Sequence, residues 1–270
     1  MTNHQFKKIV WHYFRKAGRD LPWRKTANPY KILVSEIMLQ QTQVDRVIPK
    51  YRQWLLLFPT ARSLAEAPLS KTLTAWRGLG YNRRALALQR AARLISNSKT
   101  FPREYEKILA LPGVGPYTAN AIMAFAFNQP VVMIETNIRT VFIHHFFTKT
   151  ARVTDSDILP LIEVTLDRTQ PREWYWALMD YGAHLKKEIG NASRQSAHYA
   201  KQSRFSGSDR QLRGAVLQYV STAPITITLL RRHLATAKLN PEPERLKKIL
   251  GALVVEGFLT RRGQHITLVQ

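Results

Sequence analysis

The chain has 270 residues, 45% of them hydrophobic, which is enough to build a sizeable core and excludes general disorder. It has no cysteine and no apolar run of roughly 18 residues, which excludes disulfides, thiolate-held metal or iron–sulfur centres and a membrane-spanning helix. The formal net charge of +23 favours a polyanionic partner, most simply nucleic acid, and its spread along the chain argues against a membrane-binding helix.

Helical periodicity runs through the first two thirds of the chain. Helices are expected at 4–18, 29–57, 63–67, 69–77, 82–97, 104–110, 117–128, 135–147, 155–168 and 172–185. Pro49 is expected to force a helix boundary, and Gly78 and Gly80 to form a turn. No strand is expected before residue 220. This part is predicted to be an all-α region of many short helices.

Residues 186–209 are polar, basic and poor in apolar side chains, as in a linker or an extended surface segment. Helices at 209–221, 226–235 and 241–256 follow, and then two short strands around a basic glycine turn. This is the order of a winged helix, a small α+β domain. It predicts nucleic-acid docking by the 241–256 helix, with Arg261 and Arg262 in the wing. A packing or interaction domain is the alternative.

The turn at 112–115 has two glycines just before a helix. Gly113, Val114 and Gly115 would expose backbone N–H groups at a positive helix N-terminus, which can hold a phosphate without any side chain. A helix on each side makes this a candidate helix-hairpin-helix element. An ordinary tight turn between helices is the alternative.

Glu36 lies within the apolar run 32–39, and polar residues follow it at 40–43. A desolvated carboxyl group has a raised pKa and can act as a general acid. The alternative is a salt-bridged Glu that pairs with Lys31 or Arg24. Gln41 and Thr42 suit base edges or gaps in a duplex, although the same cluster is typical of a solvated helix end.

Two more features are candidates for nucleic-acid or site chemistry. Tyr81 on its glycine turn can wedge into a base stack while Arg83 and Arg84 meet phosphates, or it can be a packed Tyr at a helix start. Glu135 begins a helix, where an acidic residue often only caps the helix or interacts with its dipole.

Several longer motifs follow one another along the chain. They are Leu-Pro-Trp-Arg at 21–24, Pro-Tyr-Lys-Ile-Leu-Val-Ser-Glu-Ile-Met-Leu-Gln-Gln-Thr-Gln-Val at 29–44, Phe-Pro-Thr at 58–60, Trp-Arg-Gly-Leu-Gly-Tyr at 76–81, Leu-Pro-Gly-Val-Gly-Pro-Tyr-Thr-Ala at 111–119 and Asp-Tyr-Gly-Ala at 180–183. Their order and spacing are far more specific than one hairpin. By these motifs, residues 22–182 resemble the helix-hairpin-helix DNA glycosylases, specifically the MutY-type adenine DNA glycosylases.

The resemblance implies an all-α fold of two helical subdomains with a cleft between them, over residues 1–205, and a winged-helix-like domain at 206–270. It also implies a monofunctional, monomeric base-excision-repair glycosylase that flips a base from double-stranded DNA. The base would be adenine opposite 8-oxoguanine or guanine. Without a signal-peptide pattern, we expect a cytoplasmic location, at the nucleoid in a bacterium.

Site roles follow from the resemblance. Glu36 would protonate the departing base and assist water. Tyr117 stands where bifunctional relatives carry a Schiff-base lysine, which argues against a lyase step. Arg24 and Asp180 would line the base pocket, and Gln41 and Tyr81 would fill the duplex. The hairpin at 113–115 would grip the backbone, with a bound monovalent cation.

The sequence departs from the family in three places. Glu135 stands where the family has the Asp that stabilises the sugar cation. Segment 184–205 has no cysteine for the family's iron–sulfur cluster, so no cofactor is expected. The family's C-terminal domain, which recognises 8-oxoguanine, is replaced by the winged-helix-like segment.

Basic residues are expected to take over the DNA contact of the missing cluster. They are Lys186, Lys187, Arg194, Lys201 and Arg204. His184 and His198 lack a ligand spacing, so no metal site is expected. The departures leave two alternatives open: a glycosylase of the same fold for uracil, thymine, hypoxanthine or an alkylated base, and a non-catalytic DNA-binding or damage-sensing protein.

Overall fold

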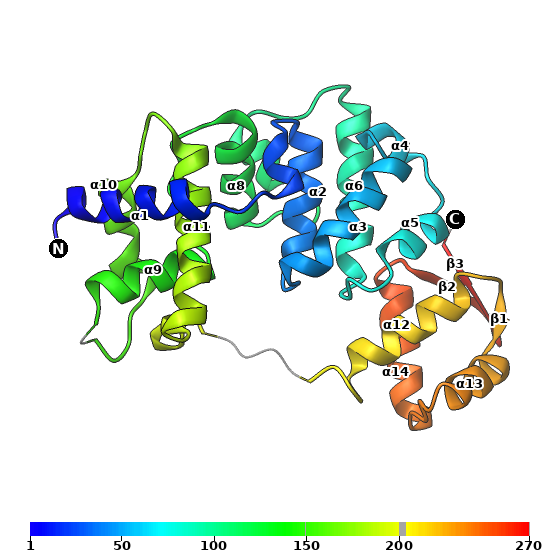
Figure 1. The fold of residues 1–270 in the computed structure, drawn as a ribbon. Helices are drawn as coiled ribbons and strands as arrows, with labels where there is room; N and C mark the ends of the chain where they lie inside the picture. The colour runs from blue at the N-terminus through cyan, green and yellow to red at the C-terminus, as the bar shows by residue number, and fades with distance from the viewer. Residues whose placement is uncertain (149, 200–203, 270) are drawn as a thin grey trace. The chain divides into compact units, whose positions relative to one another are not determined.

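The computed structural model describes residues 1–148, 150–199 and 204–269 (Figure 1). The chain folds into two compact units, each built from segments that are far apart in the sequence. The first unit comprises Met1–Glu36, Pro102–Ala110 and Val114–Lys201. The second comprises Ile37–Phe101, Leu111–Gly113 and Gln202–Gln270. Within the described ranges, no helix is both long enough and apolar enough to cross a membrane.

The first unit is helical and is organised around a long helix, α11. Its elements are α1 (Asn3–Ala17), η1 (Pro22–Lys25), the first part of α2 (Pro29–Leu39), α7 (Tyr105–Leu109), α8 (Pro116–Phe127), α9 (Thr136–Phe146), α10 (Asp155–Thr165), α11 (Pro171–Glu188) and η2 (Ala192–Gln195). Helix α11 packs against both α1 and α9. Phe6 of α1 lies between Phe142 and Trp174, with ring centroids 5.0 and 6.1 Å away, so aromatic packing joins the three helices.

Helices α9 and α11 come close together at Gly182. A Cβ atom at this position would lie 2.2 Å from the carbonyl oxygen of Asn137. Only glycine fits there without moving one helix away from the other. This close approach fixes the start of α9, where Glu135 lies, against α11.

The second unit contains the helices that follow α2. They are α3 (Val44–Leu57), α4 (Ala61–Ala65), α5 (Leu69–Trp76) and α6 (Arg83–Asn97). Trp54 packs against Phe58 and Trp76, with ring centroids 4.8 and 5.4 Å away. The expected boundary at Pro49 is wrong, because Pro49 lies inside α3. The chain breaks earlier, at 40–43, where Gln41 has a positive φ of 55°.

The C-terminal part of the second unit has winged-helix order. It consists of α12 (Asp209–Val220), β1 (Ile225–Thr226), α13 (Ile227–Thr236), α14 (Pro243–Val255), β2 (Leu259–Arg262) and β3 (His265–Leu268). The antiparallel sheet has the order β1-β3-β2. Phe258, Leu253 and Leu230 are fully buried in its core. The sequence predicted two of the three strands; β1, two residues long, is too short to give a period-two pattern.

The predicted fold class, a helical protein with a small α+β C-terminal part, is confirmed. Apart from the range 29–57, the predicted helices each match an observed α-helix to within a few residues at each end. Caps explain several of the helix starts. Thr2, Thr60 and Thr154 each form a capping box with the residue three positions on.

We expect Gly182→Ala to lower the free energy of unfolding by about 1–3 kcal/mol, because its Cβ overlaps a backbone oxygen that cannot move alone. Chemical denaturation would measure this change. Gly251→Ala in α14 is the matched control. Its Cβ would meet no atom within 4 Å, so it should stabilise the helix by up to about 1 kcal/mol. Equal changes in the free energy of unfolding for Gly182→Ala and Gly251→Ala would contradict the close contact between α9 and α11.

Candidate active site

Helix α2 buries a carboxyl group among apolar side chains. Leu33, Val34 and Ile37 are fully buried, and Glu36 is only 6% exposed. Burial is the main cause that raises the pKa of Glu36 to about 7. The predicted ion pair with Lys31 or Arg24 does not hold this group, because its hydrogen-bond partner is the Tyr117 hydroxyl, which lowers the pKa in part. At neutral pH, Glu36 is therefore poised to give or take a proton.

Tyr117 is the second residue of α8, directly after the glycine hairpin. Burial, and then the charges of Glu36 and Glu135, hold its pKa well above the usual value. The phenol therefore stays protonated and donates to the Glu36 carboxyl group. The structure brings together these two predicted site residues, which lie 81 positions apart in the sequence.

Glu135 is the N-cap of α9. Its Oε1 accepts from the backbone N–H groups of Asn137 and Ile138 at 2.7 and 2.8 Å. The capping interaction considered from the sequence is thus present. Glu135 is also near enough to Glu36 for its negative charge to raise the pKa of that group further. Glu135 therefore caps α9 and interacts electrostatically with Glu36 at the same time, because the backbone hydrogen bonds hold its carboxyl group in one position.

Lys186 belongs to the same neighbourhood. Its Nζ donates to Asn137 Oδ1 at 2.8 Å, and the side chain is half-buried. Burial lowers its pKa, the charge of Arg139 lowers it further, and Glu135 opposes both. The sequence placed Lys186 in a DNA-contacting surface segment, whereas the structure places it on the last turns of α11 with its ammonium group directed at the start of α9.

Arg24 and Asp180 form a buried ion pair. Asp180 is 2% exposed, and the Arg24 guanidinium donates to both of its carboxylate oxygens at 2.7 and 2.8 Å. The backbone N–H and the side chain of Arg19 donate to the same carboxylate. Burial alone would raise the pKa of Asp180, but the Arg24 and Arg19 contacts hold it below its usual range. The pair ties η1 to α11 in the first unit.

The second unit holds the predicted duplex-contacting residues. Gln41 and Tyr81 both have positive φ, 55° and 49°, on two tight turns. Arg84 joins these turns: its guanidinium donates to the carbonyl oxygens of Met38 and Gly80, among others, and to the Thr42 hydroxyl. Burial lowers the pKa of Arg84 to about 10. Arg84 therefore holds the two turns together, with its guanidinium bonded inside the protein.

The hairpin has the backbone that the two glycines predict. Gly113 has φ +81°, and a Cβ there would lie 2.9 Å from the Cβ of Ala87. Its carbonyl accepts from Gln40 Nε2 at 3.3 Å. Gly115 is the N-cap of α8 without a side chain, and Val114 between them is 9% exposed. A Cβ atom at Gly115 would meet no atom within 4 Å, so the space beside this residue is open.

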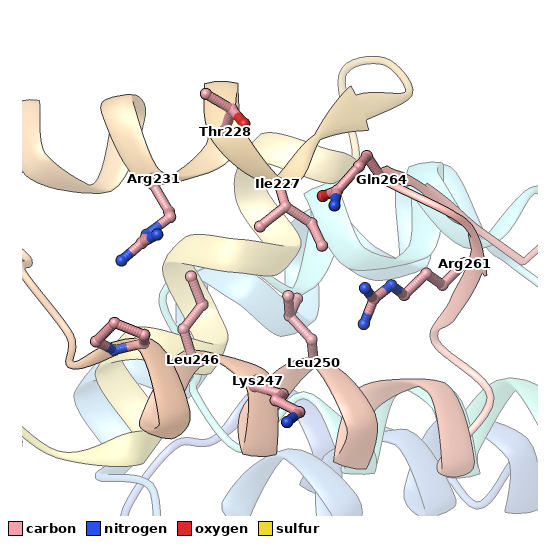
Figure 2. Close-up of a pocket in the computed structure, with 9 residues that line it drawn as sticks. Ile227, Thr228, Arg231, Leu246, Lys247, Leu250, Arg261 and Gln264 are labelled. Carbon is pink, nitrogen blue, oxygen red and sulfur yellow. The ribbon is translucent and has the colours of Figure 1, made fainter.

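The wing has its own basic pocket, of about 380 Å³ (Figure 2). Arg231 of α13, Lys247 of α14 and Arg261 of β2 line it together with Gln264. Arg261 and Arg262 are both exposed, as predicted for a wing. Arg261 Nε donates to the Gly263 carbonyl oxygen at 2.9 Å, which orders the turn.

The segment that replaces a cluster loop carries no thiolate, so a cysteine-held iron–sulfur cluster does not fit this chain. Among the described residues there is also no group of three or more His, Asp or Glu that suits a metal ion. The short helix η2 packs against α9 instead. Ser193 and Ser196 are buried, and Ser196 pairs with Val153 in an isolated bridge.

The basic residues predicted in this segment differ in their surroundings. Lys187, Arg194 and Arg204 are exposed, and Lys201 lies outside the described residues. His184 stacks on Tyr13, with ring centroids 4.8 Å apart.

Sequence reasoning missed the link between Arg210 and Tyr81. The Arg210 guanidinium lies 4.8 Å from the Tyr81 ring centroid and donates to its hydroxyl oxygen. The two residues are 129 positions apart, and neither carries a motif that points to the other. Only the docking of α12 near the 78–81 turn brings them together.

Two substitutions should move the pKa of Glu36 in opposite directions. Tyr117→Phe removes the hydrogen bond that lowers it, so the pKa should rise above about 7. Glu135→Gln removes the charge that raises it, so the pKa should fall. The ¹³Cδ chemical shift of Glu36 in an NMR pH titration measures both. Shifts of the same sign in the two variants would contradict the geometry of the site.

The comparisons with known proteins agree on one family. The model described as "HhH-GPD superfamily base excision DNA repair protein" matches residues 34–161. An adenine DNA glycosylase of Mycolicibacterium smegmatis is 34% identical over 270 residues, which cover 92% of this chain and 90% of the relative. One of Buchnera aphidicola is 36% identical over 190 residues, and the match spans about half of that relative, 53%.

Solved structures show the same fold. A thermostable thymine-DNA glycosylase matches with a TM-score of 0.60 and 26% identity, over 73% of this chain and 96% of the other. A trapped endonuclease III–DNA covalent intermediate matches with a TM-score of 0.59 and 18% identity, over 68% and 87%. The match to the Mycolicibacterium smegmatis protein, which covers 90% of that relative, shows which family this chain belongs to. The chain belongs to the HhH-GPD superfamily of base excision DNA repair proteins and, within it, to the adenine DNA glycosylases.

Proposed function

We propose that this glycosylase hydrolyses the N-glycosidic bond of an adenine mispaired with 8-oxoguanine or guanine in duplex DNA, and that it acts as a monomer. The observation that carries the proposal is the buried carboxyl of Glu36, whose pKa of about 7 lets it deliver a proton at neutral pH. The names of the mycobacterial and Buchnera relatives support adenine as the base.

In this mechanism Glu36 transfers its proton to a ring nitrogen of the flipped adenine. The bond between the base and C1′ then breaks, its electron pair leaves with the base, and positive charge develops on the sugar. Glu135, fixed by the backbone of α9, stabilises that charge. Water adds to C1′, and its proton returns to the Glu36 carboxylate, which restores the acid.

The same site supports hydrolysis without a lyase step. A lyase of this kind needs an amine that forms a Schiff base with C1′. Tyr117 presents a protonated phenol beside Glu36, and a phenol cannot form an imine. The nearby ammonium of Lys186 is bonded to Asn137 Oδ1. We therefore propose that the products are free base and an intact abasic strand.

DNA contacts are proposed for three surfaces. The backbone at Gly113–Gly115 would hold a phosphate at the start of α8, with a monovalent cation at the same hairpin. Gln41, Thr42 and Tyr81 would contact the duplex at the mispair. The exposed Lys187, Arg261 and Arg262 would add non-specific contacts to the DNA backbone.

Arg24 and Asp180 are proposed to support the wall of the base pocket.

One observation favours a second substrate. The structure of a thymine-DNA glycosylase is 26% identical and is matched over 96% of its length. Removal of thymine from a mispair is therefore the alternative function. Glu36 and Glu135 would serve it by the same chemistry, with the proton delivered to a pyrimidine oxygen.

Glu36→Gln should lower the single-turnover rate of base release by about 10²–10⁴-fold and leave DNA binding intact, because only the proton donor is lost. The wild-type rate should fall with rising pH above about 7, where Glu36 is ionised. A variant with full activity would contradict the proposal, as would a rate that does not change across neutral pH.

Ionisation of Glu36 should lower the free energy of unfolding at high pH. Glu36 keeps its proton up to about pH 7 in the folded state, but releases it near the ordinary value of 4.5 in the unfolded chain. The unfolded state binds fewer protons between these values, so stability falls as pH rises through this window. Glu36→Gln should be roughly 3 kcal/mol more stable than wild type at about pH 8 and similar at about pH 4. Denaturation at both pH values checks the sign.

The substrate is tested with duplexes that carry adenine opposite 8-oxoguanine, adenine opposite guanine, or thymine opposite guanine. We expect release of adenine from the first two, without strand cleavage before alkali treatment. Release of thymine alone would reassign the base and keep the Glu36 chemistry. Release from none of the three, with tight binding to all, would reject both substrates.

A further inference from the structure

A large groove lies in the second unit beside Tyr81. It has a volume of about 1190 Å³ and is bordered by the turn at 78–83, by α12 and by α14. The C-terminal part of the chain thus forms one side of the groove. We propose that this groove binds the sugar–phosphate backbone of one DNA strand, with phosphates on Arg46, Arg77 and Lys248, and that Arg210 holds Tyr81 in place at its edge. This inference rests on the proposed function only in taking DNA as the ligand.

The first support is charge. Seven Lys or Arg side chains line the groove, against one acidic residue, Asp209. Some of these cations are already paired, as Arg245 is with Asp209 at 2.7 Å. Across the described parts of the chain, the exposed Arg46, Arg77 and Lys248 form no ion pair. Unpaired cations along a groove suit a chain of phosphates, because each contact releases condensed counterions.

The second support is an aromatic ring fixed among these cations. Two guanidinium groups contact Tyr81, with Arg210 4.8 Å and Arg84 5.5 Å from its ring centroid. Arg210 also lies 5.4 Å from the ring of Phe205 and donates to the Tyr81 hydroxyl. An ordered aromatic ring beside a cationic groove is the arrangement that binds a nucleic-acid strand, by stacking and charge together.

The third support is that hydrogen bonds connect the helices on the two sides of the groove, α6 on one side and α12 and α14 on the other. Glu256, at the C-terminal end of α14, accepts from Arg83 of α6 and from Arg213 of α12. Arg90 of α6 donates to the Glu256 carbonyl oxygen at 3.0 Å. At Gly257, with φ +82°, a Cβ would lie 2.7 Å from the Arg90 guanidinium. The groove is therefore a built feature of this unit.

The occupant is a DNA strand and not an acidic peptide, because the groove adjoins Gln41 and Tyr81 on the turns that Arg84 locks together. An anionic peptide would use the cations but would gain nothing from a ring held at the edge. Polyglutamate is therefore the competitor that separates these two ligands.

The test measures DNA affinity and is independent of base release. Fluorescence anisotropy with an undamaged duplex gives Kd over a series of salt concentrations for Arg46→Gln, Arg77→Gln and Lys248→Gln. Each variant should bind about eightfold more weakly at about 0.1 M salt, and should reduce the slope of log K against log salt by about 0.9. The triple variant should lose about 2.7 in slope.

Lys99→Gln is the matched control. Lys99 is exposed and follows the C-terminal end of α6, about 20 Å along the helix from the groove end at Arg83. Its slope should stay at the wild-type value. Groove variants that behave like Lys99→Gln, with unchanged thermal melting, would overturn the proposal. Competition by polyglutamate that matches unlabelled duplex would overturn it as well.

The role of Arg210 is tested by a double-mutant cycle on the same Kd. Arg210→Ala and Tyr81→Ala should each weaken binding, and Arg210→Ala should cost much less in the Tyr81→Ala background, since its effect passes through the ring. Strictly additive effects would overturn the positioning role. If these binding results hold but no adenine is released from a mispair, the groove stands and the proposed substrate alone fails.

Discussion

The burial of one carboxyl group is the constraint on which the site depends. Helix α2 buries Glu36 beside Leu33, Val34 and Ile37, so the ionised form of this residue is costly and the proton stays bound up to about pH 7. A hydrogen bond from Tyr117 offsets part of this cost. It places the second carboxylate, Glu135, on a helix N-terminus where backbone donors stabilise the negative charge. The two carboxyl groups of the site thus lie in different environments, one buried among apolar side chains and one bonded to backbone N–H groups.

The rest of the first unit serves to fix these groups. Gly182 lets α11 approach α9, and this contact sets the position of the Glu135 cap. The Arg24–Asp180 pair fixes η1, just before α2, to α11. In the second unit, Arg84 satisfies carbonyl oxygens on two turns at once and so determines the backbone that carries Gln41 and Tyr81. Residues that hold the backbone in place therefore alternate along the chain with those for which a reactive role is proposed.

The sequence predicted the helices, the winged-helix order and the burial of Glu36, because these follow from local periodicity, from turn residues and from the apolar run around that residue. The boundary predicted at Pro49 was wrong: this proline lies inside α3, where it removes one backbone N–H donor without ending the helix. The sequence did not reveal the surroundings of Arg84 and Lys186, because a charge pattern does not show which cations are buried. The Arg210–Tyr81 contact needs tertiary structure, as no local rule links residues so far apart.

The way in which the segment around η2 is held has a consequence for the conditions in which the protein can fold. Ser193 and Ser196, the bridge to Val153 and the packing on α9 hold this segment through contacts that the chain itself supplies. The 270 residues contain no thiol that peroxide can oxidise. This segment therefore acquires its structure without iron delivery, and oxidants that destroy iron–sulfur centres find no such centre to attack in it.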